Sequence, residues 1–283
     1  MILKIVRTFL VCALLVFPFF AGALISRFSP YIETNSLTGF VTAWLLLSTA
    51  IAVLLFAVMH RFRYAIPQPA TGGILLFFIG CVIAGIAGLA APPDLSIAML
   101  KHPEREHCRY ILLFAGALLF GAFFLYHFRT TSFTQGRKLM ILTFILAFIE
   151  LIWEFSHHYL YPEALKEWMA QGKKAEDFGK QYDNFTIVSI GAAGRFFQFI
   201  LIMWLSVQLY RLRKVNLWNP VLTSMFSLLG ILSAIVIVAT KIHYPKPLEF
   251  LFLFFIPGIP FLLLYWQGVA LLTKPTTKNP QNN

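Results

Sequence analysis

Leu139–Tyr161 reads LMILTFILAFIELIWEFSHHYLY and decides the fold class. The stretch is apolar and long enough to cross a bilayer as one helix, since a spanning helix needs about 20 residues. It nevertheless carries four ionisable side chains, those of Glu150, Glu154, His157 and His158. Helical periodicity places these four and Tyr161 on one face, within an arc of about 100° and a length of about 16 Å. Ionisable groups are costly in hydrocarbon, so this face predicts a functional site or a buried ion pair.

The composition of the whole chain is that of a polytopic membrane protein. Of 283 residues, 59% are hydrophobic and 12% charged, and the mean hydropathy is +0.75. Soluble domains carry about 25% charged residues, so this chain has too little polar surface to enclose its core in water. In such a chain the net charge of +11 reflects how the protein is oriented in the membrane. We therefore expect the lipid bilayer as its partner and no nucleic acid. The three cysteines, Cys12, Cys81 and Cys108, offer no disulfide framework and no metal-type spacing.

Eight apolar stretches of spanning length predict an all-α bundle of eight transmembrane helices, a single domain over residues 1–273 followed by a polar cytoplasmic tail, Lys274–Asn283. The stretches are Ile2–Ile25, Thr38–Met59, Thr71–Ala91, Cys108–Phe128, Leu139–Tyr161, Thr186–Leu209, Val221–Thr240 and Leu248–Thr273. The first also resembles a cleaved signal peptide, but its apolar run continues past the small residues Ala21 and Ala23. We expect it to be retained as a helix.

The distribution of charge predicts that both chain ends are cytoplasmic. With that orientation the inner segments carry twelve basic residues and no acidic residue. These are Lys4, Arg7, Arg61, Arg63, Arg129, Arg137, Lys138, Arg211, Arg213, Lys214, Lys274 and Lys278. The outer segments carry ten basic and ten acidic residues. So one-sided a distribution of lysine and arginine is typical of the positive-inside rule.

Reporter fusions test this topology. A fusion at Asn283 is expected to be active only as a cytoplasmic reporter, and a fusion within Gly172–Lys180 only as an external one, because the basic inner loops resist translocation. A C-terminal fusion that is active outside the cell contradicts the assignment.

Small residues recur at four-residue spacing on two of the predicted helices. Gly80, Ala84 and Gly88 lie on the third stretch, and Ala117 and Gly121 on the fourth. This spacing lets a neighbouring backbone approach closely. The pattern is typical of internal helix packing, and the alternative is a face through which the protein forms a homo-oligomer.

Two predicted outer loops are long enough to hold structure of their own. Pro92–His107 contains DLSIAMLKH, which predicts a short interfacial helix. Pro162–Asp183 starts with a proline that suits the first turn of a helix, and Leu165, Trp168 and Met169 follow at helical spacing. This second segment is expected to lie as an amphipathic helix over the mouth of any cavity beside Glu154.

Arg195 is the only arginine deep inside a predicted span, about ten residues from the outer end of the sixth stretch. Glu150 lies at a similar depth in the fifth stretch, and Gly191 and Gly194 allow the two helices to approach. An unpaired charge at mid-membrane costs at least about 2.5–3.5 kcal/mol, so we expect Arg195 to pair with Glu150 or Glu154. A second carboxylate beside one arginine can hold a proton.

The polar side chains on this side of the bundle outnumber what one structural ion pair needs. The predicted binding residues are therefore Glu150, Glu154, His157, His158, Arg195, Gln198 and Lys241. Glu154-x-x-His157 also has the spacing of helical metal sites. Glu-x-x-His alone is a weak pattern, however, and we expect no metal or other cofactor. His60 and His127 fall at the opposite ends of their helices, as interfacial residues beside arginines.

The last stretch contains PGIP, with Pro257, Gly258 and Pro260 near mid-membrane. Such a break frees backbone carbonyl and amide groups, which transporters use at binding sites. A kink that serves packing alone is the simpler interpretation.

These patterns favour a carrier or binding protein for a small solute or a proton, with a site that opens outward, in a bacterial cytoplasmic membrane. Two alternatives remain at this stage. One is an intramembrane enzyme that acts on a lipid or cell-envelope precursor, with Glu154 and His158 as acid and base. The other is an accessory or scaffold subunit without a small-molecule site, in which the Glu/His/Arg cluster is only an ion pair.

Overall fold

The computed structural model describes residues 2–32, 34–61, 68–89, 100, 102–133 and 136–274, and this part of the chain is helical with no strand. The long helices are α1 (Ile2–Ile25), α2 (Leu37–Arg61), α3 (Gln68–Gly88), α4 (Pro103–Thr130), α5 (Arg137–Tyr159), α8 (Phe185–Arg211), α9 (Trp218–Ala239) and α11 (Gly258–Thr273). Shorter ones are η1 (Ser26–Phe28), α6 (Tyr161–Ala170), α7 (Ala175–Tyr182), η3 (Lys246–Leu251) and α10 (Phe252–Phe255). Among the described residues, seven helices are long and apolar enough to span a membrane, and the count is eight if the bent pair of η3/α10 with α11 is one span. The predicted all-α membrane bundle is confirmed.

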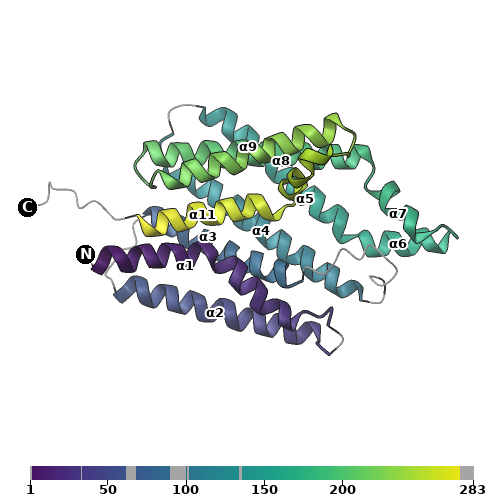
Figure 1. Cartoon of the computed structure of the whole chain (residues 1–283), viewed down its shortest axis with the longest axis horizontal. Coiled ribbons are helices and arrows are strands. Elements are labelled where there is room, and N and C mark those ends of the chain that lie inside the picture. Colours follow the sequence, from purple (N-terminus) through teal and green to yellow (C-terminus); the bar gives the residue numbers. More distant parts are fainter. Residues whose placement is uncertain are drawn as a thin grey trace, which may run out of the picture.

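The helices run back and forth along one direction (Figure 1). The start of α1 and the end of α11 lie at one end of the bundle, here called the termini end, and α6 and α7 lie at the other, here called the cap end. The spans therefore cross the bundle an even number of times. Which end faces the cytoplasm remains a prediction from the charge distribution.

Helix α11 is the central element of the bundle. It packs along α3 and also contacts α1, α4, α8 and α9, and nearly all of its side chains from Pro260 to Thr273 are buried. Helices α3, α4, α5, α8 and α9 follow one another around it, each packed against the next. Helix α2 lies at the edge, where side chains such as Leu46 are exposed and suited to lipid.

The last span is broken where the PGIP motif predicts a kink. Its two parts, Lys246–Phe255 and Gly258–Thr273, meet at 63°, and Ile256 between them has extended backbone angles. The amide of Ile259 turns to the carbonyl of Ile256. The carbonyl of Phe255, which would accept that amide's hydrogen bond in a continuous helix, is thereby left for another donor.

Helix α5 ends two residues earlier than the sequence predicts. It stops at Tyr159, and Tyr161 instead begins α6, because Pro162 suits the first turn of a new helix and cannot continue the old one. The prediction that Tyr161 shares the ionisable face of α5 is therefore wrong. Its ring is buried at the cap end against Phe178 of α7.

The small residues of α3 and α4 are used inside this chain. A Cβ on Gly80 would meet the ring of Tyr265 at 2.5 Å, one on Gly88 would meet Ile25 at 2.5 Å, and one on Gly121 would meet Phe148 at 2.9 Å. These faces are filled by the protein's own helices, as the internal-packing interpretation predicts, and are not free for a second copy.

The loop between α5 and α8 folds as the two helices α6 and α7, packed through Leu165 and Phe178. This agrees with the amphipathic helix predicted from Leu165, Trp168 and Met169. The interfacial helix predicted within Pro92–His107 falls mainly on residues 92–99 and 101, outside the described residues. The predicted tail, Lys274–Asn283, lies outside them beyond its first residue.

Candidate functional site

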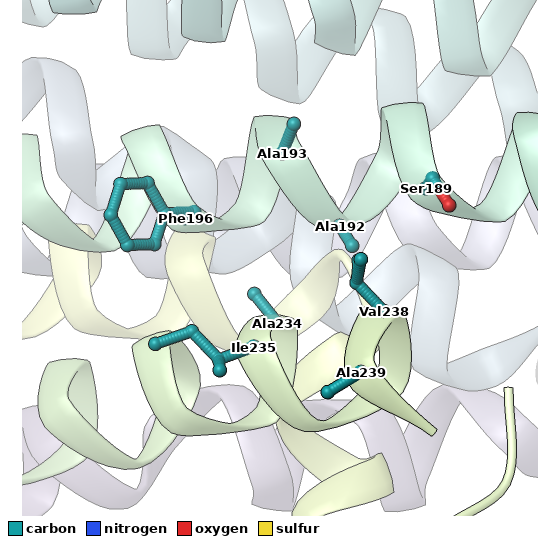
Figure 2. Close-up of a pocket in the computed structure, with 8 residues that line it drawn as sticks. All are labelled: Ser189, Ala192, Ala193, Phe196, Ala234, Ile235, Val238 and Ala239. Atoms are coloured by element: carbon teal, nitrogen blue, oxygen red, sulfur yellow. The ribbon is translucent and has the colours of Figure 1, made fainter. Parts of the chain in front are cut away.

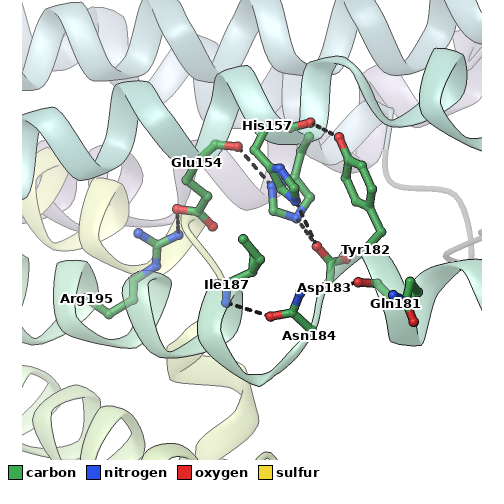
Figure 3. A network of polar contacts seen from close by, with 9 residues as sticks. Glu154, His157, Gln181, Tyr182, Asp183, Asn184, Ile187 and Arg195 are labelled. Carbon is green, nitrogen blue, oxygen red and sulfur yellow. Dashed lines mark hydrogen bonds and ion pairs between the residues drawn. The ribbon is translucent and has the colours of Figure 1, made fainter.

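A fully buried arginine joins α8 to α5 in the middle of the bundle. Arg195 Nη2 lies 2.5 Å from Glu154 Oε2, and Nη1 lies 3.5 Å from Glu150 Oε2. Figure 3 shows the guanidinium turned to Glu154 across the gap between the two helices. The predicted pairing of Arg195 with a carboxylate of α5 is confirmed, and both Glu150 and Glu154 take part.

The rest of the guanidinium is also hydrogen-bonded. Nε donates to the carbonyl oxygen of Phe255 at 3.1 Å, which is the group released by the break before α11. Nη1 donates to Gln198 Oε1 at 3.2 Å, and Gln198 Nε2 donates to Glu150 Oε2 at 2.9 Å. Glu150, Glu154, Arg195 and Gln198 are hereafter called the Arg195 cluster. The broken span completes it, which ties the PGIP kink to the site.

The Arg195 cluster contains two carboxyl groups and one guanidinium. Glu150 Oε1 is buried and has no hydrogen-bond partner among the described residues. Buried polar atoms are nearly always paired, because leaving one unpaired costs about 1–3 kcal/mol. One carboxyl oxygen is thus held in the bundle interior without a protein donor.

One of two nearby glycines of α8 makes room for Glu150. A Cβ on Gly194 would lie 1.9 Å from Glu150 Cδ, whereas one on Gly191 would meet only Phe255 at 3.5 Å and Glu150 Oε1 at 3.9 Å. The flat surface at Gly194 is therefore what lets the carboxyl group lie against α8 and reach Gln198.

Gly194→Ala is expected to destabilise the protein, because the new methyl group must displace a carboxyl group held by Gln198 and Arg195. Overpacking of this kind costs about 1–3 kcal/mol. Gly191→Ala is the matched control, since its methyl group makes only ordinary contacts. The measurement is the melting temperature in detergent, and equal values for the two variants contradict the prediction.

Towards the cap end, two histidines lie between the Arg195 cluster and the surface. His157 Nε2 lies 3.3 Å and His158 Nε2 3.6 Å from Asp183 Oδ1, and Tyr182 donates to the carbonyl of His157 at 2.7 Å. His158 Nδ1 lies 2.9 Å from the backbone carbonyl oxygen of Glu154. A carbonyl oxygen only accepts, so Nδ1 of His158 carries a proton.

Exposure increases in steps along this line of groups. The exposed fraction of the side chain is 1% for Arg195, 11% for Glu154, 17% for His157, 26% for His158 and 29% for Asp183. Figure 3 shows Arg195, Glu154, His157 and Asp183 within one network of polar contacts. The polar interior is therefore connected to the cap end, which the sequence predicts to be external.

Two tyrosines of the cap helices, outside the spans, lie within range of the charge of Asp183. Burial, together with the charge of Asp183, raises the pKa of Tyr161 to about 12, and the same causes raise that of Tyr182. Both phenols therefore stay neutral near pH 7. Tyr182 also stacks on the ring of His157, with the ring centres 4.1 Å apart.

Asp183, Tyr182 and the Phe255 carbonyl are parts of the site that the sequence prediction missed. Asp183 directly precedes Asn184, whose side chain accepts hydrogen bonds from the amides of Thr186 and Ile187. An N-cap asparagine after an acidic residue at the mouth of a polar span was the available signal. Nothing in the sequence indicates which donor takes the freed carbonyl.

Two predicted residues lie elsewhere. Lys241 follows the end of α9 and is exposed, and within the described residues no hydrogen bond or ion pair joins its side chain to the Arg195 cluster. His127 lies in the last turn of α4, the end of the span where it was predicted, but its ring is buried against Phe123. The side chain of His60 is outside the part that the structure describes.

Metal chemistry has no support from the geometry. Glu154 is engaged with Arg195, and His157 and His158 turn to Asp183. Among the described residues, no group of three or more histidine, cysteine, aspartate or glutamate side chains could hold a metal ion.

A shallow apolar hollow lies between α8 and α9. Its volume is about 480 Å³, and Figure 2 shows it lined by Ser189, Ala192, Ala193, Phe196, Ala234, Ile235, Val238 and Ala239. Only one lining side chain is polar, and none belongs to the predicted site. The hollow suits contact with hydrocarbon and supplies no chemistry.

Comparison with known proteins adds no assignment: the chain matches no family model, and neither a search of curated proteins nor one of solved structures returned a match.

Proposed function

We propose that this protein is a proton-coupled carrier for a small solute and that the Arg195 cluster is its proton-binding site. The observation that carries the proposal is the pairing of two buried carboxyl groups with one guanidinium, with Glu150 Oε1 left without a protein donor.

Charge balance supports a bound proton. With both carboxyl groups ionised the cluster carries one net negative charge in the bundle interior, where an unpaired charge costs at least about 2.5–3.5 kcal/mol. A proton shared by Glu150 and Glu154 removes that charge. It also turns one carboxyl oxygen into a donor, as happens when two carboxyl groups share a site.

The histidines supply a route for the proton to and from the cap end. An imidazole ring can donate through one nitrogen and accept through the other, and His158 contacts both the backbone of Glu154 and the carboxylate of Asp183. We propose that the cap end faces the outside of a bacterial cytoplasmic membrane. The excess of lysine and arginine at the termini end supports this orientation.

Infrared spectroscopy of the purified protein tests the proton site. At neutral pH the wild type is expected to show the C=O stretching band of a protonated carboxyl group, shifted in D₂O. Glu150→Gln and Glu154→Gln should each lose it, because the remaining carboxylate then balances Arg195 one to one. Glu163→Gln, at an exposed residue of α6, is the control and keeps the band. A wild-type spectrum that matches both cluster variants overturns the proposal.

A further inference from the structure

A second set of polar groups lies between the Arg195 cluster and the termini end. Five side chains that are each fully buried form it, here called the inner seam: Ser206 of α8, Asn219, Thr223 and Ser227 of α9, and Gln267 of α11. Ser206 donates to Asn219 Oδ1 at 2.9 Å, and Gln267 Nε2 donates to the carbonyl of Ile202 at 2.8 Å.

Most of the inner seam has unused hydrogen-bonding capacity. Four of its side-chain atoms have no partner among the described residues: Asn219 Nδ2, Thr223 Oγ1, Ser227 Oγ and Gln267 Oε1. Native interiors contain only a few such atoms per 100 residues. Four of them in one seam, donors and acceptors together, call for a common partner.

The seam runs along the interface between α8 and α9. Asn219, Thr223 and Ser227 follow at four-residue spacing on one face of α9, and Gly230 on the same face lies against the ring of Phe199 of α8. Ser227 is about 12 Å along the axis from Asn219. Asn219 is joined to Ser206 of the antiparallel helix α8. Ser227 is eight residues from Asn219 and Gln198 is eight residues from Ser206, so the seam extends to the depth of Gln198.

The inner end of the seam meets a basic loop. The amide of Asn219 donates to the carbonyl of Asn216, and Lys274 Nζ donates to Asn216 Oδ1 at 3.0 Å. Lys214 lies in the same loop, and its Nζ donates to Thr131 Oγ1. Burial lowers the pKa of Lys214. The seam thus connects the level of the Arg195 cluster with polar groups at the termini end.

We propose that the inner seam binds a chain of internal water molecules and is the route by which the proton leaves the Arg195 cluster towards the termini end. A buried water makes about three hydrogen bonds to polar groups that would otherwise be unpaired, which is what the amide and hydroxyl groups here offer. The role in proton release rests on the proposed function, but the hydration of the seam does not.

Silver-ion labelling of cysteine variants tests the hydration directly. Cys12, Cys81 and Cys108 are first replaced by alanine, in a background shown to melt like the wild type. Ag⁺ is a small aqueous ion that bonds a thiol sulfur and releases its proton. Ser227→Cys and Thr223→Cys are expected to be blocked by Ag⁺ at least about tenfold faster than Leu228→Cys, since the thiolate that reacts needs a polar setting.

Leu228 is the matched control because it neighbours Ser227 in depth and points away from the bundle, where it is exposed to lipid. Blocking is scored after denaturation, by the loss of alkylation with a maleimide. Equal rates at the three positions, whether all fast or all slow, overturn the hydrated seam.

A second measurement compares Thr223→Val with the wild type by melting temperature. Valine has the shape of threonine, so replacing a dry and unpaired hydroxyl should raise the melting temperature, whereas replacing a hydrated one should lower it. A rise contradicts the proposal.

The infrared band separates the two ideas. Thr223→Val and Gln267→Leu are expected to keep the protonated-carboxyl band while slowing proton release to the termini side of proteoliposomes. If the seam cysteines are not blocked faster than the control but the protonated-carboxyl band is present, only the hydrated seam is contradicted. If the seam cysteines are blocked faster but the band is absent, only the proton site is contradicted. Proton release at the wild-type rate in both variants defeats the seam as the route.

Discussion

Arg195→Leu is expected to leave almost no folded protein in the membrane. Removing the guanidinium strands Glu150 and Glu154, and it also takes the donors away from the Phe255 carbonyl and the Gln198 amide. Breaking a buried ion pair by removing one partner costs about 3–5 kcal/mol, a large part of the stability of a typical protein. The measurement is the amount of protein in the membrane, together with its melting temperature in detergent.

Two further variants show whether unpaired charge is the cause. Arg211→Leu removes the same charge from an exposed position at the end of α8 and is expected to leave melting unchanged. Combining Arg195→Leu with Glu150→Gln and Glu154→Gln removes all three ionisable groups, and this should recover a substantial part of the loss. If Arg195→Leu alone accumulates and melts like the wild type, the arginine does not organise the bundle.

The sequence predicts the bundle well because its physical determinants are local. Composition and apolar length mark each span, and observed α1 has the bounds that its apolar run predicts. Errors fall at ends: α5 stops at Tyr159 because Pro162 starts a separate helix. A count of apolar residues cannot detect such a boundary, whereas the position of the proline can.

The site was predictable where residues lie on one helix or at one depth. Glu150, Glu154, His157 and His158 share a face of α5, and the depth argument alone brings Arg195 to it. What could not be predicted depends on the packing of helices distant in sequence. The freed carbonyl of Phe255 reaches Arg195 only because α10 and α11 lie beside α8.

His127 and Lys241 illustrate the same limit from the opposite side. A histidine near the end of a span is usually interfacial, but the ring of His127 is buried because Gly72 of α3 leaves room beside it. Lys241 lies at the expected end of α9, yet its backbone has the positive φ of 51° that ends the helix, and its side chain stays exposed. The depth of a residue in the membrane does not by itself determine the direction in which its side chain points.

Glu154→Gln is expected to abolish the protein's activity while leaving it folded. The Arg195 cluster holds two carboxyl groups for one guanidinium, so the neutral amide leaves a balanced pair of Arg195 with Glu150. Glutamine also keeps the shape of the side chain and part of its hydrogen bonding. Folding therefore tolerates the change, whereas a site that binds and releases a proton loses the group nearest to His157 and His158.

The comparison that decides the point is Glu154→Gln beside Glu154→Ala, Glu150→Gln and Glu163→Gln. Glu154→Ala is expected to lower the melting temperature, because it opens a gap beside Arg195 and leaves the Nη2 group without its acceptor. Both glutamine variants of the cluster should melt within a few degrees of the wild type. Glu163 is exposed on α6 and contacts only His107 in the described ion pairs, so its variant controls for loss of one acidic charge.

Activity is read as growth, in a strain in which deletion of the protein causes a defect. Glu150→Gln and Glu154→Gln are expected to grow like the deletion strain despite normal expression, and Glu163→Gln like the wild type. A purely structural ion pair predicts the reverse order, with Glu154→Gln close to wild type and only Glu154→Ala impaired, because the balanced pair still joins α5 to α8. Wild-type growth from a normally expressed Glu154→Gln variant would therefore mean that the Arg195 cluster only joins α5 to α8 as a structural ion pair.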